Sequence, residues 1–222
     1  MRYFPLTVVE DFFVEPHLVL EFAKTAEYKP RGETNYPGVV TTPLNQEITN
    51  WVATKALSSF YDFKTTSLSW IGNSTFQKIT PYGDENQFHI LNRGIPHTDS
   101  AHVAGVVYLD VNPCKDAGTS FFQKKPGRDF YQRPEEFLEA AKKYHSGIKL
   151  DNYEEMLQTH LDSFEETMRV QPKFNRLILY SSDVWHCQTS YGVSDTRHTF
   201  RFFLNITTTE EANFLPLQRF NE

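Results

Sequence analysis

The stretch TRHTFRFFLNITTT, residues 196–209, constrains the fold more than any other part of the chain. Alternate side chains of a β-strand point to opposite faces of the sheet. Arg197, Thr199 and Arg201 therefore share one face of the expected strand, and Phe200 lies on the other. Two arginines on a core-facing surface are unusual unless that face lines a pocket for an anion. The alternative is a strand face that is exposed to solvent.

Several other segments have the β-branched and aromatic composition of strands. They are YFPLTVVEDFFV at 3–14, SLSWIGNSTFQKIT at 67–80 (a strand or a hairpin), HVAGVVYLDV at 102–111, GTSFFQKK at 118–125 and KFNRLILYSSDVWHCQTS at 173–190. Aromatic residues make up 15% of the chain, which favours a β-rich core.

Helical patterns occur in two places, before the main strands and between them. They cover EPHLVLEFAKTAEY at 15–28, NQEITNWVATKALSSFYDF at 45–63, RPEEFLEAAKKYH at 133–145 and NYEEMLQTHLDSFEETM at 152–168, with a turn-rich loop predicted at 29–39. His17, His145 and His160 fall in these helices, where we expect solvated faces. The order predicts a single α+β domain over 1–222, with a sandwich or barrel core. Its core strands are expected at about 67–125 and 173–208, with a helical insertion at about 126–172.

Composition narrows the class of protein. The formal net charge of −6 gives the chain no global field for a phosphate backbone, so nucleic acid is a disfavoured partner. The two cysteines form no disulfide framework. The first residues carry acids within their apolar stretch, unlike a secretory signal, and no run is long enough to span a membrane. We therefore expect a cytoplasmic protein without a membrane partner.

The segment RGIPHTDSAH, residues 93–102, places His97 and Asp99 two residues apart. On a strand these side chains share a face and could bind Fe(II), Mn(II) or Zn(II) side by side, given a third ligand. The same pair also fits an ordinary surface strand. His186 is the best candidate for the third ligand, because it follows an apolar strand and a Ser-Ser-Asp turn that can aim it into a barrel mouth.

The order of these motifs resembles that of the Fe(II)- and 2-oxoglutarate-dependent dioxygenases, in their prolyl-hydroxylase-like branch. GIPHTDS, AGVVYLDV, AGTSFF, FNRLILYSSDVWH and RHTFRFFLN are similar to successive core strands of that family, over roughly residues 70–125 and 173–208. The N-terminal helices and NYPGVV at 35–40 resemble a bacterial and phage branch of it. The resemblance implies a double-stranded β-helix core of the jelly-roll or cupin-like type. Supporting N-terminal helices and a helical insertion complete the expected fold.

The resemblance also implies a ligand set. His97, Asp99 and His186 would hold Fe(II), leaving three coordination positions for 2-oxoglutarate and dioxygen. Arg197 would bind the far carboxylate of 2-oxoglutarate, assisted by Thr199.

Two tyrosines and one further arginine belong to the same implied pocket. Tyr108 matches a tyrosine that helps to bind the far carboxylate, and Tyr82 matches a second pocket tyrosine less closely. Arg201 is a rival of Arg197 for the carboxylate, and the Arg-x-Thr spacing favours Arg197.

The implied reaction is hydroxylation of a C–H bond with release of succinate and CO2, with ascorbate as a reductant. The substrate stays open among a peptide, an amino acid and a small molecule. The insertion at 126–172 either covers the mouth of the pocket or is a solvated surface feature. The alternative function is a jelly-roll module that binds a metal without oxidising anything.

Overall fold

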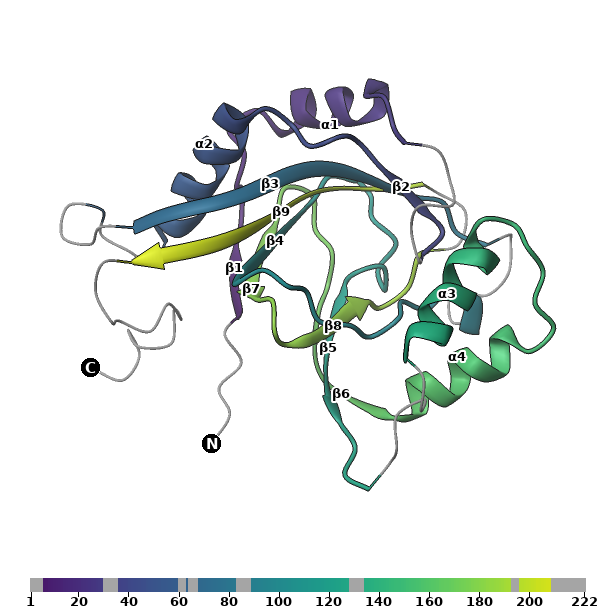
Figure 1. Ribbon diagram of the computed structural model, residues 1–222. Coiled ribbons are helices and arrows are strands. Elements are labelled where there is room, and N and C mark those ends of the chain that lie inside the picture. Colours follow the sequence, from purple (N-terminus) through teal and green to yellow (C-terminus); the bar gives the residue numbers. More distant parts are fainter. Residues whose placement is uncertain are drawn as a thin grey trace.

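The computed structural model describes residues 6–29, 36–59, 63, 68–82, 89–127, 134–192 and 196–208. Their elements are β1 (Leu6–Val9), α1 (Pro16–Thr25), β2 (Gly38–Val40), α2 (Gln46–Leu57), β3 (Leu68–Ile79), η1 (Ile90–Asn92), β4 (Val103–Tyr108), β5 (Thr119–Lys124), α3 (Pro134–His145), α4 (Tyr153–Asp162), β6 (Phe164–Val170), β7 (Leu177–Ser181), β8 (Trp185–Gln188) and β9 (Arg197–Thr208). The strands form two antiparallel sheets, β1-β7-β4-β9-β3-β2 and β6-β5-β8. Figure 1 shows α1 and α2 over the outer face of the larger sheet, and α3 and α4 beside the smaller one.

Strand β9 lies inside the larger sheet and has a partner on each side. It pairs with β3 from Arg197 opposite Ile79 to Thr208 opposite Leu68, and with β4 along Val103–Tyr108. This confirms the long strand predicted at 196–209. Because both edges of β9 are paired, the orientation of its side chains is set by two registers at once.

The outer face of the larger sheet is apolar and is covered by α1 and α2. Phe200, Phe202 and Leu204 of β9 belong to one buried cluster with Leu20 of α1 and Val52 of α2. Helix α2 starts at a capped residue, since the Asn45 side chain accepts a hydrogen bond from the Ile48 backbone N–H at 2.9 Å. In the described part of the chain, no helix has both the length and the apolar character needed to cross a bilayer.

The inner face of the larger sheet packs against the smaller sheet. Tyr108, Ile178 and Tyr180 contact Phe121 of β5 and Val170 of β6 in a second buried cluster. This α+β arrangement of two antiparallel sheets agrees with the predicted class. The space between the sheets is where the inward side chains of β9 lie.

Helices α3 and α4 form a third buried cluster of their own. Its members are Phe137, Ala141, Tyr153, Leu157 and Leu161, together with Ile95 from the segment before β4. The helices of the predicted insertion are therefore present. Their cluster also holds the segment that leads into the His-x-Asp motif.

Two predicted segments fold differently. The helix expected at 152–168 ends at Asp162, and Phe164–Val170 forms β6 instead. The acidic residues of that stretch favour a helix locally, but pairing with β5 provides backbone partners that a local pattern does not reveal. In the same way Gly38–Val40, within a stretch expected to be a loop, forms β2 by pairing with β3.

The expected solvated faces of His145 and His160 are wrong. Their exposed fractions are 8% and 7%. Each lies where its helix meets the rest of the third cluster: His145 contacts Tyr153, and His160 contacts Phe137. Tertiary packing of α3 on α4 buries these side chains, and helical periodicity alone did not show it.

Candidate metal centre

The His-x-Asp motif lies on an extended segment between η1 and β4 and is held by backbone hydrogen bonds to β8. His97 and His186 form an isolated antiparallel bridge, with N–H to carbonyl distances of 3.0 and 2.9 Å. The Asp99 N–H donates to the Ser182 carbonyl at 2.9 Å. The motif predicted a regular strand here, whereas the structure has a single isolated bridge between His97 and His186.

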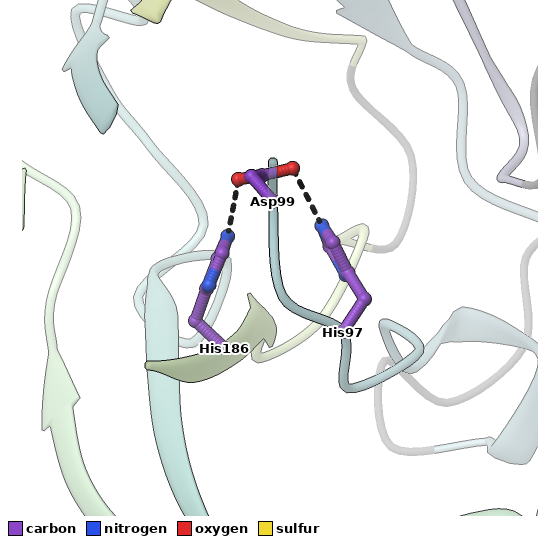
Figure 2. Close-up of side chains that lie close together, drawn as sticks. All are labelled: His97, Asp99 and His186. Atoms are coloured by element: carbon purple, nitrogen blue, oxygen red, sulfur yellow. Dashed lines mark ion pairs between the residues drawn. The ribbon is translucent and has the colours of Figure 1, made fainter. Parts of the chain in front are cut away.

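The three predicted ligands converge on one point. Asp99 Oδ2 lies 3.2 Å from His186 Nε2, and Asp99 Oδ1 lies 3.9 Å from His97 Nε2. Figure 2 shows the carboxylate between the two rings, with a ring nitrogen of each turned toward it. One ligand atom of each residue lies within 4.8 Å of the others. This spacing suits one shared cation.

Backbone carbonyls fix the orientation of both rings. His97 Nδ1 is 2.8 Å from the Ile95 carbonyl, and His186 Nδ1 is 2.8 Å from the Val184 carbonyl. A carbonyl can only accept, so each Nδ1 carries a hydrogen, and each Nε2 is the ring nitrogen left to bind a metal. Two Nε2 atoms and a carboxylate then face one another, and a cation between them would bind all three.

The protonation states agree with ligand roles. Burial, together with the nearby His186, lowers the pKa of His97 to about 4. Burial opposes ionisation of Asp99, but the nearby His186, His97 and Arg201 outweigh it and hold the pKa of Asp99 below its usual value. At neutral pH the site therefore offers a neutral His97 imidazole and a carboxylate, the forms that bind metals.

Arg197, at the start of β9, is buried in the space between the sheets with 5% of its surface exposed. Its Nε donates to the Ala117 carbonyl at 3.0 Å, and its guanidinium carbon lies 5.5 Å from the ring centre of Tyr108. Its buried Nη1 has no hydrogen-bond partner among the described residues. An incompletely paired buried guanidinium is costly, and an anion would complete it.

One narrow cavity of about 50 Å³ contains most of the predicted site. It is lined by His97, Asp99, His186, Arg197 and Arg201, with further residues from both sheets. Arg197 also lines a neighbouring cavity of about 250 Å³, which Tyr108 lines as well. The structure thus brings the metal candidates and the anion candidates together.

The remaining predicted residues differ in their positions. Thr199 Oγ1 donates to Gln77 at 3.0 Å, and the Tyr108 hydroxyl is bonded to Thr119 at 2.8 Å. Tyr82 is not among the residues that line the cavity, and its hydroxyl is bonded to His145 of α3. The predicted place of Tyr82 in the pocket therefore has no support from its contacts.

Three polar residues of the cavity wall were not predicted from the sequence. Gln77 and Thr119 line the cavity, as does Tyr180. Gln77 pairs with Thr199 across β3 and β9, so the alternation of 67–80 carried a usable signal for it. Thr119 and Tyr180 were not distinguishable in sequence from core positions.

The fold is similar to that of two proteins that were solved with 2-oxoglutarate and a metal bound. It is similar to HygX from Streptomyces hygroscopicus, solved with nickel, 2-oxoglutarate and hygromycin B: TM-score 0.53, 12% identity, covering 91% of this chain and 83% of that one. It is also similar to the epimerase SnoN, solved with Fe3+, alpha ketoglutarate and nogalamycin RO: TM-score 0.54, 9% identity, covering 93% and 82%. The chain shares its fold with these two proteins, which agrees with the resemblance seen in the sequence.

The family itself is defined by sequence. Residues 2–207 match the sequence model described as a family of unknown function, DUF6445, and the chain belongs to that family. No curated protein matches the chain in sequence. The family description assigns no activity, so the site itself has to carry the functional argument.

Proposed function

We propose that the protein is an Fe(II)- and 2-oxoglutarate-dependent dioxygenase that hydroxylates a C–H bond, with release of succinate and CO2. The observation that carries the proposal is the shared cavity: three metal-binding side chains face one point, and a buried, incompletely paired guanidinium lines the same space. A double-stranded β-helix core, which the two antiparallel sheets and the fold shared with SnoN support, would present these groups from facing sheets.

Each side chain has a defined task in this proposal. His97, Asp99 and His186 hold Fe(II), and the Nδ1 hydrogen bonds of the histidines keep each Nε2 directed at the metal. The bound metal, 2-oxoglutarate and dioxygen together supply the oxidant, with ascorbate as the reductant that keeps iron ferrous. The protein therefore needs no nucleophile of its own.

Arg197 binds the far carboxylate of 2-oxoglutarate in this proposal. Its Nε is already fixed by the Ala117 carbonyl, so Nη1 is the donor left for the ligand. The Tyr108 ring beneath the guanidinium restricts its position. Thr199, next but one on the same face of β9, supports this end of the pocket through Gln77.

A small molecule is the best-supported substrate class. HygX and SnoN, the two similar structures, were solved with hygromycin B and nogalamycin RO, respectively. The two comparisons cover 91% and 93% of this chain. We therefore favour a small organic substrate over a peptide. The proposed enzyme is a single cytoplasmic domain spanning 1–222.

The test is succinate release from 2-oxoglutarate in the presence of Fe(II) and ascorbate. The wild-type protein is expected to release succinate, and His97→Ala to lose at least about 100-fold of that rate because one of three ligands is gone. His17→Ala is the matched control, since His17 lies on α1 and contacts Phe174, away from the cavity. Unchanged succinate release by His97→Ala would contradict the proposal.

The second candidate is a metal-binding jelly-roll module without activity. The unpartnered Arg197 Nη1 argues against it, because such a module has no use for a buried cation beside the metal. Anaerobic calorimetry separates the two: a module binds Mn(II) alone, whereas the dioxygenase also binds 2-oxoglutarate once the metal is present.

A further inference from the structure

Arg201 is a second cation in the candidate active site, and the proposed reaction gives it no task. It lies on the same face of β9 as Arg197 and lines the cavity that contains the three metal candidates. Its Nε donates to Thr75 Oγ1 at 3.1 Å, and its guanidinium carbon lies 5.6 Å from the ring centre of Phe203. Within the described residues no carboxylate forms an ion pair with it.

The charges around the cavity do not balance without a further anion. Among the described residues that line it, Asp99 is the single acid, against Arg197 and Arg201. A divalent metal adds two positive charges, and the 2-oxoglutarate dianion removes two. One positive charge is left over in a confined space of low dielectric, where an unbalanced charge is costly. A monoanion restores the balance, and a carboxylate matches the fork of the guanidinium.

The two arginines serve different ends of the cavity. Four residues of strand separate them by about 13 Å. Arg201 lies opposite the middle of β4, whereas Arg197 lies beyond the end of β4, and the His-x-Asp segment leads into the start of that strand. Arg197 instead interacts with Tyr108, whose ring lies beside it, and with Asp110. Arg197 therefore marks the far end of the cosubstrate, and Arg201 lies toward the metal end.

We propose that Arg201 binds the carboxylate of the substrate to be oxidised, so that the substrate is a small carboxylic acid. This inference rests on the proposed dioxygenase function. A carboxylate at Arg201 could come from two sources, the substrate or the metal-end carboxylate of 2-oxoglutarate, and two measurements distinguish them. Bidentate binding at this position would hold the acid at a fixed distance from the metal and so select the C–H bond that reacts.

The first measurement is anaerobic calorimetry of 2-oxoglutarate binding to the Mn(II)-loaded full chain. We expect Arg197→Gln to weaken the binding by about 30-fold or more and Arg201→Gln to change it less than about threefold. Arg169→Gln is the control, because Arg169 pairs with Glu166 outside this cavity. If Arg201→Gln weakens 2-oxoglutarate binding as strongly as Arg197→Gln, Arg201 holds the cosubstrate and the substrate assignment is wrong.

The second measurement uses matched acid and amide probes on the protein saturated with Mn(II) and 2-oxoglutarate, without oxygen. The pairs are benzoate and benzamide, hexanoate and hexanamide, and N-acetylglycine and N-acetylglycinamide. Paramagnetic broadening of their proton NMR signals reports binding next to the metal. We expect at least one acid to bind about tenfold more tightly than its amide, a preference lost in Arg201→Gln and retained in Arg201→Lys.

The outcomes separate the two proposals. If the wild-type chain binds neither Mn(II) nor 2-oxoglutarate, the dioxygenase function itself fails. If it binds both but shows no preference for any acid over its amide, the dioxygenase function stands and the role of Arg201 is overturned.

Discussion

The two faces of β9 divide the work of this molecule. On the outer face Phe200, Phe202 and Leu204 lie in an entirely apolar cluster. On the inner face Arg197 and Arg201 line a polar cavity with the metal candidates. One strand therefore contributes to the apolar core on one side and to the candidate metal site on the other, separated by the width of the backbone.

The larger cavity does not lie on the side of the sheet that contains the candidate metal site. The outer side has an apolar cavity of about 470 Å³ between α1 and α2, lined by residues such as Leu18 and Trp51. The inner cavity is about one tenth of that volume. What identifies the inner side is unpaired charge and convergent ligand atoms, which are costly to bury without a function.

The strongest test of this division is Phe202→Ala on the outer face. Phe202 is fully buried, and its ring occupies the space beside Gly105, where an added Cβ would lie 2.1 Å from it. We expect a loss of about 3–5 kcal/mol in the free energy of unfolding, measured by urea denaturation. Ile71→Ala is the matched control, since Ile71 is 81% exposed, and should change it by less than about 0.5 kcal/mol.

The same variant should leave the inner face intact under conditions in which the protein is folded. At urea concentrations below its denaturation midpoint, Phe202→Ala is expected to bind Mn(II) with the affinity of the wild-type protein. A parallel loss of metal affinity and stability would show that the two faces are coupled.

The sequence predicted those structural features that depend on a single segment of the chain. Alternation along 196–209 placed Arg197 and Phe200 on opposite faces, and the register with β3 and β4 confirms it. The parts that could not be predicted depend on distant partners. Strand β6 exists because β5 pairs with it, and Tyr82 is bonded to His145, 63 residues away in the chain.

The third cluster, around α3 and α4, offers a test by pH. Burial lowers the pKa of His145 to about 4, and its two ring nitrogens are bonded to the hydroxyls of Tyr82 and Tyr153. In the unfolded chain the pKa is about 6.5, so the unfolded state binds the proton first as the pH falls. Stability should therefore be lost between about pH 6.5 and 4, by on the order of 2–3 kcal/mol.

The control for this prediction is His145→Gln, which keeps an amide in place of the ring but does not titrate. Unfolding by urea at pH 7 and pH 4.5 should show a smaller loss in the variant than in the wild-type chain. Equal losses would assign the pH dependence to other groups, such as His160, whose pKa burial also lowers.

Arg197→Met on the inner face is expected to stabilise the protein, in contrast to the losses of stability predicted above. The substitution removes a buried cation with an unpaired Nη1 and keeps an unbranched side chain. It also removes the bond to the Ala117 carbonyl, which offsets part of the gain. We expect the metal-free and cosubstrate-free chain to become more stable by about 1 kcal/mol while 2-oxoglutarate binding is lost. A stability loss above about 1 kcal/mol would make Arg197 a structural residue instead.

The last prediction tests whether the third cluster supports the metal site. His160 Nε2 of α4 donates to the Pro96 carbonyl at 3.0 Å, directly before His97. Ile95, whose carbonyl fixes the His97 ring, is buried in the same cluster. Removing the His160 donor should therefore loosen the backbone that orients His97.

We expect His160→Leu to weaken Mn(II) binding by about tenfold, which corresponds to about 1.4 kcal/mol, the upper range for one hydrogen bond. His160→Gln places an N–H donor within reach of the same carbonyl and should recover most of the affinity. Calorimetry measures both variants, and urea denaturation checks that they are folded. If His160→Leu binds Mn(II) as the wild-type protein does, the insertion is independent of the metal site. A tenfold loss with recovery in His160→Gln would mean instead that the insertion stabilises the metal site, because its buried cluster holds the carbonyls on which the orientation of His97 depends.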